Sequence, residues 1–406
     1  MLRLEVIVNI ENSISMKKKI IGITGCRSEY DIIYPVMREM QKGGSFDVSL
    51  IVCGTHLSDN FGYTVSEIEK DGFLIDGRIH SLVDSDREVG KAKGAGILMM
   101  GLSDSLDRIE PDYVMVVGDR EESIVTGIVC TYLGIPLIHL CGGDRTEPEA
   151  GDVDESVRHA TSKLANLHFV MNEEHRERLL KMGEESWRVY NTGNPALDRF
   201  NEVESMDKKE ILRYFQFNNE KDMEKPLILV IQHVISGEVA DGARQIRNTL
   251  EAITSLKCNV IINYPNSDMG SREIISVIEN YRKQPNVRIS RNIPRKEFVN
   301  LLRNINLLVG NSSMALLEGS FLAIPAINVG KRNWNRMNGG NVIFVAAEID
   351  KIREEAEKIL FDKELSCKLR NCSSVYGDGN ASIKIVVSLK KLNKTRTELI
   401  AKNITY

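Results

Sequence analysis

A glycine-rich turn after an apolar run is the segment of this chain whose residue types best suit phosphate chemistry. Ile305–Val309 is predicted to be a buried strand, and Gly310–Ser313 then leads into an amphipathic helix. Free N–H groups at a helix start and the helix dipole both favour an anion, and Ser312 and Ser313 add hydroxyl groups. Glu318, about one and a half turns into the helix, would suit a hydroxyl-rich partner such as a ribose. An ordinary strand–turn–helix with serine as the N-cap is the alternative.

Charged residues crowd the end of a second apolar run. Tyr113–Val117 is followed by Gly118 and then by four charges in a row, from Asp119 to Glu122. Charges at a strand end are costly in a core and are tolerated where that end faces a ligand or solvent. A helix N-terminus enriched in acids explains the two glutamates, but it does not explain Arg120, whose charge is unfavourable there. Asp119 and Arg120 are therefore candidates for chemistry.

A third group of charges lies at the start of another predicted helix. Asp154 can cap this helix, and Glu155 lies in its first turn. Arg158 comes four residues after Asp154, and His159 four after Glu155. Each acid therefore shares a helix face with a base, which is suited to proton transfer. A charged capping box with surface pairs is the alternative.

Basic residues follow two further predicted strands. Arg27 lies in Gly25–Asp31, directly after the strand Ile20–Thr24. Another three follow the strand Ala326–Val329, namely Lys331, Arg332 and Arg336. Ligands of doubly wound sheets bind at the carboxyl ends of the strands, so these cations fit a phosphate-bearing ligand. A solvated turn is the alternative for Arg27.

The composition limits the class of protein. A length of 406 residues favours two domains of roughly 180 residues each. The net charge of −4 gives no general attraction to nucleic acid or to an acidic membrane surface. Seven cysteines without metal-type spacing predict reduced thiols in a cytoplasmic protein and no metal site. No apolar stretch reaches the ~18 residues of a membrane span.

Strands and helices alternate along the chain, which predicts parallel sheets with helices on both faces. The first series of strands is Ile20–Thr24, Val48–Cys53, Tyr113–Val117, Leu137–Leu140 and His168–Met171. The second series is Leu227–Gln232, Asn259–Asn263, Val287–Ile289, Leu307–Val309 and Ala326–Val329. We expect an extension (1–16), a Rossmann-like domain (17–199), a connecting segment (200–225), a Rossmann-like nucleotide-binding domain (226–380) and a C-terminal helix and tail (381–406). No G-x-G-x-x-G motif follows the first strand, which argues against a dinucleotide-binding oxidoreductase.

Gly310–Ser313, Glu318 and the later Tyr-Gly-Asp-Gly-Asn at Tyr376–Asn380 together resemble the UDP-N-acetylglucosamine 2-epimerase family. The loop Gly25-Cys-Arg-Ser-Glu is nearer to the hydrolysing branch of that family than to the Gly-Thr-Arg-Pro-Glu of the non-hydrolysing branch. The resemblance covers residues 17–390. It implies a glycosyltransferase-B arrangement of two domains facing a cleft, a final helix crossing back to the first domain, and a homo-oligomer, either a dimer or a tetramer.

The resemblance also implies roles for individual residues. The expected catalytic residues are Asp119, Asp144, Asp154, Glu155, Arg158 and His233. The expected nucleotide-sugar ligands are Arg27, Asp31, Arg120, His233, Asn266, Ser312, Ser313, Glu318 and Arg332. Asp31 is repelled by phosphate, so it is assigned to the sugar, the base or helix capping. Among the other histidines, we expect His168 to be structural, and His56, His80 and His175 to be surface or loop residues.

Two features depart from the family pattern. Cys141 stands where eukaryotic members carry Glu and bacterial relatives can carry His, and a thiol is a poor proton donor. Asp144 is the nearest acid that can substitute for it. The acidic loop Thr146–Asp152 is longer than the family's. Both features point to an altered sugar.

The function implied is a hydrolysing UDP-N-acetylglucosamine 2-epimerase of sialic acid biosynthesis. It would convert UDP-N-acetylglucosamine and water into N-acetylmannosamine and UDP by elimination and then hydration. This chemistry needs a base, an acid and cations on the departing diphosphate, and no redox cofactor or metal. The alternatives are a hydrolysing 2-epimerase of a UDP- or GDP-2,4-diacetamido-2,4,6-trideoxy sugar from the legionaminic acid pathway, a non-hydrolysing 2-epimerase, a glycosyltransferase of the same architecture, and a non-catalytic nucleotide-sugar sensor.

Overall fold

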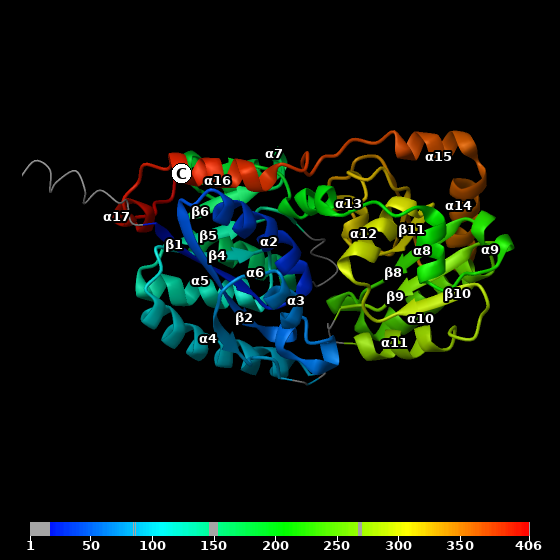
Figure 1. Ribbon diagram of the computed structural model, residues 1–406, viewed down its shortest axis with the longest axis horizontal. Coiled ribbons are helices and arrows are strands. Elements are labelled where there is room, and N and C mark those ends of the chain that lie inside the picture. The colour runs from blue at the N-terminus through cyan, green and yellow to red at the C-terminus, as the bar shows by residue number, and fades with distance from the viewer. Residues whose placement is uncertain (1–16, 84, 86, 146–152, 267–269, 406) are drawn as a thin grey trace, which may run out of the picture.

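The chain folds into two lobes that lie side by side along the long axis of the molecule (Figure 1). The computed structural model describes residues 17–83, 85, 87–145, 153–266 and 270–405. Each lobe has a parallel sheet with helices on both faces, as the alternation of strands and helices predicts. The fold class predicted from the sequence is therefore confirmed. Within these residues, no helix has the length and apolar character that crossing a membrane requires.

The N-terminal lobe has a seven-stranded sheet in the order β3-β2-β1-β4-β5-β6-β7. Its strands are β1 (Lys18–Thr24), β2 (Phe46–Cys53), β3 (Ile75–Ile79), β4 (Tyr113–Val117), β5 (Leu137–Leu140), β6 (Leu167–Val170) and β7 (Val189–Asn191). Its helices are α2 (Arg27–Lys42), α3 (Val65–Lys70), α4 (Glu88–Ile109), α5 (Glu121–Leu133), α6 (Val153–Leu164) and α7 (Glu173–Lys181), and the short 3-10 helix η5 (Pro195–Glu202) follows β7.

The C-terminal lobe has a six-stranded sheet in the order β10-β9-β8-β11-β12-β13. Its strands are β8 (Leu227–Ile231), β9 (Asn259–Asn263), β10 (Val287–Ser290), β11 (Leu307–Gly310), β12 (Ala326–Val329) and β13 (Val342–Val345). The helices after η5 are α8 (Lys208–Tyr214), α9 (Glu220–Glu224), α10 (Gly242–Thr254), α11 (Ser271–Glu279), α12 (Arg295–Asn304), α13 (Met314–Leu317), α14 (Ile349–Phe361), α15 (Lys363–Arg370), α16 (Ala381–Lys391) and α17 (Arg396–Ile400).

The strand order reverses between β1 and β4 in one sheet and between β8 and β11 in the other. In doubly wound sheets the loops at such a reversal diverge and leave room for a ligand. The central strands that position these loops are wholly buried; every residue of β4 and of β8 is buried. The two reversals therefore mark where each lobe can bind a ligand.

Three strands were not anticipated from the sequence, and all three lie at sheet edges. These are β3, β7 and β13. The sequences of β3 and β7 include polar residues, so they lack the continuous apolar run that indicates a buried parallel strand. The centre of β3, Asp76-Gly77-Arg78, shows this clearly. The sequence of β13 is apolar throughout, so this reason does not apply to it.

The last long helix crosses back to the first lobe, as expected. In Figure 1, α15 lies over the C-terminal lobe, whereas α16 lies over the N-terminal lobe beside α2. Asp198, in η5, accepts hydrogen bonds from the backbone N–H of Ala381 at 3.0 Å and of Ser382 at 2.7 Å, and so fixes the start of α16. The proposed domain boundaries at residues 199, 225 and 380 remain our proposal.

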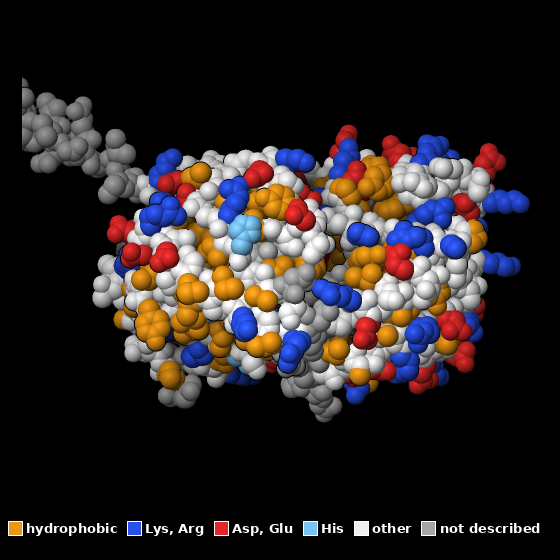
Figure 2. Space-filling view, turned by 90° about the horizontal axis from the view of Figure 1, so that it is seen from below, with side chains coloured by type: hydrophobic (Ala, Val, Ile, Leu, Met, Phe, Trp, Pro, Cys, Tyr) orange, Lys and Arg blue, Asp and Glu red, His pale blue; other side chains and the backbone are white. Residues whose placement is uncertain are grey.

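The surface carries charges of both signs. On the face in Figure 2, the described Lys and Arg side chains alternate with Asp and Glu, and apolar side chains lie between them. That face presents no continuous basic field among the residues described, in keeping with a net charge of −4.

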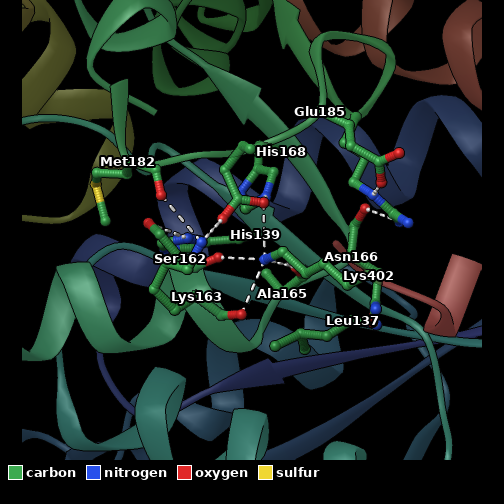
Figure 3. Close-up of polar contacts among 12 residues, drawn as sticks. Leu137, His139, Ser162, Lys163, Ala165, Asn166, His168, Met182, Glu185 and Lys402 are labelled. Carbon is green, nitrogen blue, oxygen red and sulfur yellow. Dashed lines mark hydrogen bonds and ion pairs between the residues drawn. The ribbon is translucent and has the colours of Figure 1, made fainter. Parts of the chain in front are cut away.

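The C-terminal tail, which follows α17, contacts the end of α6 through Lys402 (Figure 3). The Lys402 ammonium donates to the carbonyls of Ser162 at 3.0 Å, Lys163 at 2.8 Å and Ala165 at 2.6 Å. It also pairs with the buried Glu184 at 2.8 Å. A lysine that satisfies the last carbonyls of a helix is a C-terminal cap, so the tail stabilises α6.

Lys402→Met should destabilise the fold, because three helix carbonyls and a buried carboxylate lose a shared donor. We expect the free energy of unfolding to fall by about 1–3 kcal/mol, measured by urea denaturation. Lys391→Met, on the exposed face of α16, is the matched control and should change little. Equal midpoints for wild type and Lys402→Met would show that the tail does not stabilise α6.

Candidate active site

A buried guanidinium organises the N-terminal half of the site. Arg158, on α6, is 2% exposed. Its Nε donates to Asp119 Oδ2 at 3.1 Å, and its Nη1 donates to Glu155 Oε2 at 2.6 Å. A second guanidinium nitrogen also contacts Asp119. The fold thus brings Asp119, Glu155 and Arg158 into one cluster, although they come from two separate segments of the sequence.

One carboxylate of this cluster is partly exposed at the end of β4. Asp119 is 30% exposed although its partner is buried, so part of this side chain faces solvent. Glu155 is 17% exposed, and its second oxygen lies 3.0 Å from His159 Nε2. Two carboxylates and an imidazole around one fixed cation are groups that can accept and return protons.

The predicted role of Asp154 in capping is wrong. The helix α6 begins at Val153, so Asp154 lies inside the first turn, and the capping position falls outside the described residues. Arg158 pairs with Glu155, three residues away, and not with Asp154. The pair between Glu155 and His159 was correctly expected from their spacing.

Asp144 connects the two lobes. One carboxylate oxygen pairs with the Arg336 guanidinium, which follows β12, and the other accepts the Arg145 backbone N–H at 2.8 Å and lies 3.3 Å from His175 Nε2. Burial opposes the charge, but Arg336, His175 and Arg158 hold the pKa of this carboxyl well below its usual range. An anion held in this way is a poor proton donor, so Asp144 does not suit the acid role we expected of it.

The site contains residues that sequence reasoning missed. His175 was expected to be a surface or loop residue, but it is 2% exposed and faces Asp144 from α7. His56, for which the expectation was the same, lies in the segment between β2 and α3 and is buried between Thr24 and Thr64. Arg336 was noticed only as one of three cations after a strand. In the sequence, only its position shortly after a predicted strand indicated that Arg336 belongs to the site.

Cys141 lies at the end of β5 with a backbone φ of 61°, in the left-handed region. It is buried, and burial together with the charges of Asp144, Asp119 and Glu318 raises the pKa of its thiol. The residue therefore stays a neutral thiol, and it does not replace the carboxyl that other members of the resembled family carry there.

The C-terminal half of the site is built around Asn311. Its Oδ1 accepts from the His233 backbone N–H at 2.7 Å, and its Nδ2 donates to the His233 carbonyl at 2.9 Å. The Asn266 backbone N–H in turn donates to His233 Nδ1 at 3.1 Å. This bond makes Nδ1 the acceptor and places the ring proton on Nε2. The loops after β8, β9 and β11 are locked together in this way.

The phosphate turn differs from the sequence prediction in one respect. Gly310 has a φ of 136°, and a Cβ there would meet the Ile231 carbonyl at 1.9 Å, so only glycine fits. The helix that follows, α13, has only four residues, and Ser313 at its start makes no side-chain cap bond. The prediction of an amphipathic helix that extends past Glu318 is therefore wrong. Ser312 and Ser313 remain candidate ligands through their hydroxyl and N–H groups.

Glu318 ends α13 instead of lying within a longer helix. Burial raises the pKa of its carboxyl to about 7, against the opposing effect of Arg295. One of its oxygens is buried and has no hydrogen-bond partner among the described residues. An acceptor of this kind suits a ligand hydroxyl.

Arginines connect the two lobes at a second place. Asp31 pairs with Arg199 and, at 3.3 Å, with Arg295 of α12. Asp31 lies inside α2, so its alternative role as a helix cap is wrong. Arg27 donates to the Asn292 side chain across the junction. These cations lie where the start of α2 faces the start of α12.

The remaining predicted residues also lie at strand ends. Arg120 precedes α5, with its guanidinium 4.0 Å from Glu121 and 3.8 Å from Glu122. Arg332 donates to the Asn311 carbonyl at 3.3 Å. Among the described residues, no three His, Cys, Asp or Glu side chains gather closely enough to hold a metal ion.

Arg336→Met should destabilise the protein strongly, because it removes the guanidinium that pairs with the buried Asp144 carboxylate. We expect a loss of about 3–5 kcal/mol at pH 7, measured by urea denaturation. Asp144 has a depressed pKa, so its contribution is present above pH ~4 and is lost as the pH falls below that value. The difference from wild type should therefore shrink toward pH 3.

Arg332→Met is the matched control, because Arg332 lies on the same loop and has no carboxylate partner among the contacts described. The double variant Asp144→Asn/Arg336→Met should recover part of the lost stability. If the double variant loses as much stability as Asp144→Asn and Arg336→Met lose together, the two side chains do not stabilise each other across the lobes.

The comparison with protein families is clear. The family described as UDP-N-acetylglucosamine 2-epimerase matches residues 38–390. The chain is similar to a UDP-N,N'-diacetylbacillosamine 2-epimerase (hydrolyzing) of Legionella pneumophila, with 33% identity over 93% of this chain and 97% of that protein. It is also similar to a GDP/UDP-N,N'-diacetylbacillosamine 2-epimerase (hydrolyzing) of Campylobacter jejuni, with 31% identity over 84% of this chain and 88% of that protein.

Solved structures agree on the fold. The UDP-GlcNAc 2-epimerase of Neisseria meningitidis, solved with UDP-GlcNAc bound, superposes with a TM-score of 0.79 at 22% identity, covering 92% of this chain and all of that one. The family match spans most of the sequence, and the first relative exceeds 30% identity along nearly its whole length. The chain belongs to the UDP-N-acetylglucosamine 2-epimerase family.

Proposed function

We propose that this protein is a hydrolysing 2-epimerase of a UDP- or GDP-linked 2,4-diacetamido-2,4,6-trideoxy sugar. Its products would be the C2-inverted free sugar and the nucleoside diphosphate. The observation that carries the reaction class is the Asp119–Arg158–Glu155 cluster at the β1/β4 reversal. The names of the Legionella and Campylobacter relatives support the sugar and the hydrolytic outcome.

The proposed chemistry begins with loss of the proton at C2 to a carboxylate. The C2–H electrons form a C1=C2 double bond while the C1–O bond breaks, and its electrons leave on the diphosphate. Water then adds at C1, and a proton returns to the opposite face of C2. Asp119 and Glu155 are assigned to the two proton transfers. Asp144 is left out because Arg336, His175 and Arg158 hold its pKa well below the usual range, against the effect of burial.

Cations and hydroxyls would hold the departing diphosphate. They include Arg27, Arg120, Arg332, Ser312 and Ser313, which lie at strand ends of the two lobes. Positive groups aimed at a leaving oxyanion stabilise the charge that develops as the C1–O bond breaks. Glu318, with its unpartnered oxygen, is assigned to the ribose hydroxyls.

UDP-N-acetylglucosamine is the second candidate substrate. It is the ligand named for the Neisseria meningitidis structure. Cys141 favours the first candidate, because a buried neutral thiol is a smaller and less polar neighbour for the sugar than a carboxyl is. Incubation with a panel of UDP- and GDP-linked amino sugars would discriminate the two. The homo-oligomer and the cytoplasmic location stay predictions.

Asp119→Asn should lose at least ~10²-fold in turnover, because an amide cannot accept the C2 proton. Binding of UDP, measured by calorimetry, should stay within a few-fold of wild type. The control Asp107→Asn makes the same change on the exposed face of α4. If Asp119→Asn turns over at the wild-type rate, the assignment of Asp119 is wrong.

The product formed in D₂O separates the possible reactions. A hydrolysing 2-epimerase should release a free sugar with one deuterium at C2 and inverted configuration, observed by NMR and mass spectrometry. A non-hydrolysing epimerase would leave the deuterated sugar attached to the nucleotide. A simple hydrolase would release undeuterated sugar with C2 unchanged. Either of these two outcomes would refute the proposal.

A further inference from the structure

The outer face of α4 carries an apolar stripe that the described residues do not cover. Val89, Ile97 and Met100 are 49%, 39% and 64% exposed. Lys93 and Asp104 are also exposed. Successive members of this set are three or four residues apart, so all five lie along one side of the helix. A helix on the surface of a lone chain normally presents polar residues on that side.

The stripe belongs to the N-terminal lobe. In Figure 1, α4 runs along the lower edge of this lobe, so the view from below in Figure 2 looks onto the helix. Apolar side chains are grouped on that half of the face. Apolar side chains that adjoin one another on a surface mark a contact with another molecule, whereas single scattered ones need no explanation.

A glycine in the middle of the stripe favours contact with a second helix. A Cβ added to Gly94 would meet the Ser81 carbonyl oxygen at 2.7 Å, and one added to Gly101 would meet Ile79 at 2.8 Å. Packing within the lobe therefore accounts for these two glycines. A Cβ added to Gly96 would meet no atom from the rest of the described chain within 4 Å. Glycine inside a helix is destabilising relative to alanine, and the close approach of another helix would account for its presence here.

The stripe has the same spacing when it is read in either direction. Ile97 follows Lys93 by four residues, and Asp104 follows Met100 by four. Two copies of α4 that lie antiparallel about an axis between Ile97 and Met100 bring these two residues together. Lys93 of one copy then faces Asp104 of the other, so opposite charges meet at both ends of the contact.

We propose that this stripe is a contact between two copies of the chain, related by a two-fold axis with the α4 helices antiparallel. A two-fold contact uses the same surface on both copies, so that surface must be complementary to itself. The stripe meets this condition in its charges and in its apolar residues, and Gly96 lets the helices approach. A different protein as the partner would not require self-complementarity. The inference does not rest on the proposed function.

The first experiment measures mass in solution by sedimentation velocity, with the whole chain at several concentrations. Wild type should be a dimer or a multiple of one. Met100→Asp should raise the dissociation constant at least ~100-fold, because the two-fold axis places the new charge in the contact twice. Phe361→Asp, the matched control, changes a 60% exposed residue of α14 in the other lobe and should leave the mass unchanged.

Two results of this experiment would overturn the contact. One is a wild-type chain that is monomeric at every concentration. The other is a Met100→Asp variant that associates as wild type does, because a different surface would then hold the copies together.

Gly96→Leu tests the same contact without a charge. The change fills open space and replaces glycine by a stronger helix former, so a single chain should melt above the monomeric Met100→Asp variant. Between two copies the added side chain holds the helices apart, so the variant should sediment as a smaller species than wild type. Association of Gly96→Leu at the wild-type level would overturn the proposal that the helices meet at this glycine.

A charge exchange tests the antiparallel arrangement. Lys93→Asp and Asp104→Lys each place like charges opposite one another, so each variant alone should associate several-fold more weakly than wild type. In an equimolar mixture of the two variants, opposite charges face each other again at both ends, and association should return. A mixture that associates no better than the separate variants would overturn this arrangement.

Discussion

The buried Arg158 guanidinium is the constraint on which the site depends. An ion at 2% exposure must be neutralised and fully hydrogen-bonded, or it would destabilise the fold by several kcal/mol. Its partners come from the end of β4, from the loop after β5 and from its own helix α6. Satisfying this one cation therefore fixes three segments relative to one another. The same requirement places Asp119 and Glu155 beside one guanidinium.

At the junction between the lobes, arginines are likewise neutralised by carboxylates. Arg336 is paired with Asp144, and Arg295 with Asp31, across the junction. These pairs neutralise largely buried arginines that the two lobes bring together, and so limit the cost of holding several positive charges close to one another.

Sequence reasoning succeeded where a residue's chemistry follows from its place on a central strand. The ends of β4, β8 and β11 could be located because their apolar runs are continuous, and these ends carry Asp119, His233 and Gly310. It failed at three of the four edge strands, and in β3 and β7 polar residues interrupt the apolar run. It also failed for His175, because a polar residue on an amphipathic helix has the same local sequence whether it faces solvent or a buried acid.

The sequence by itself determined the fold class, the two strand series and most of the candidate side chains, because apolar periodicity and glycine positions are local properties. Which charges meet was decided only by the tertiary structure. Arg158 pairs with Glu155 and Asp119, and Asp144 pairs with Arg336 of the other lobe. The physical reason is that the energy of a charge depends on its burial and its neighbours, and folding supplies both from distant parts of the chain.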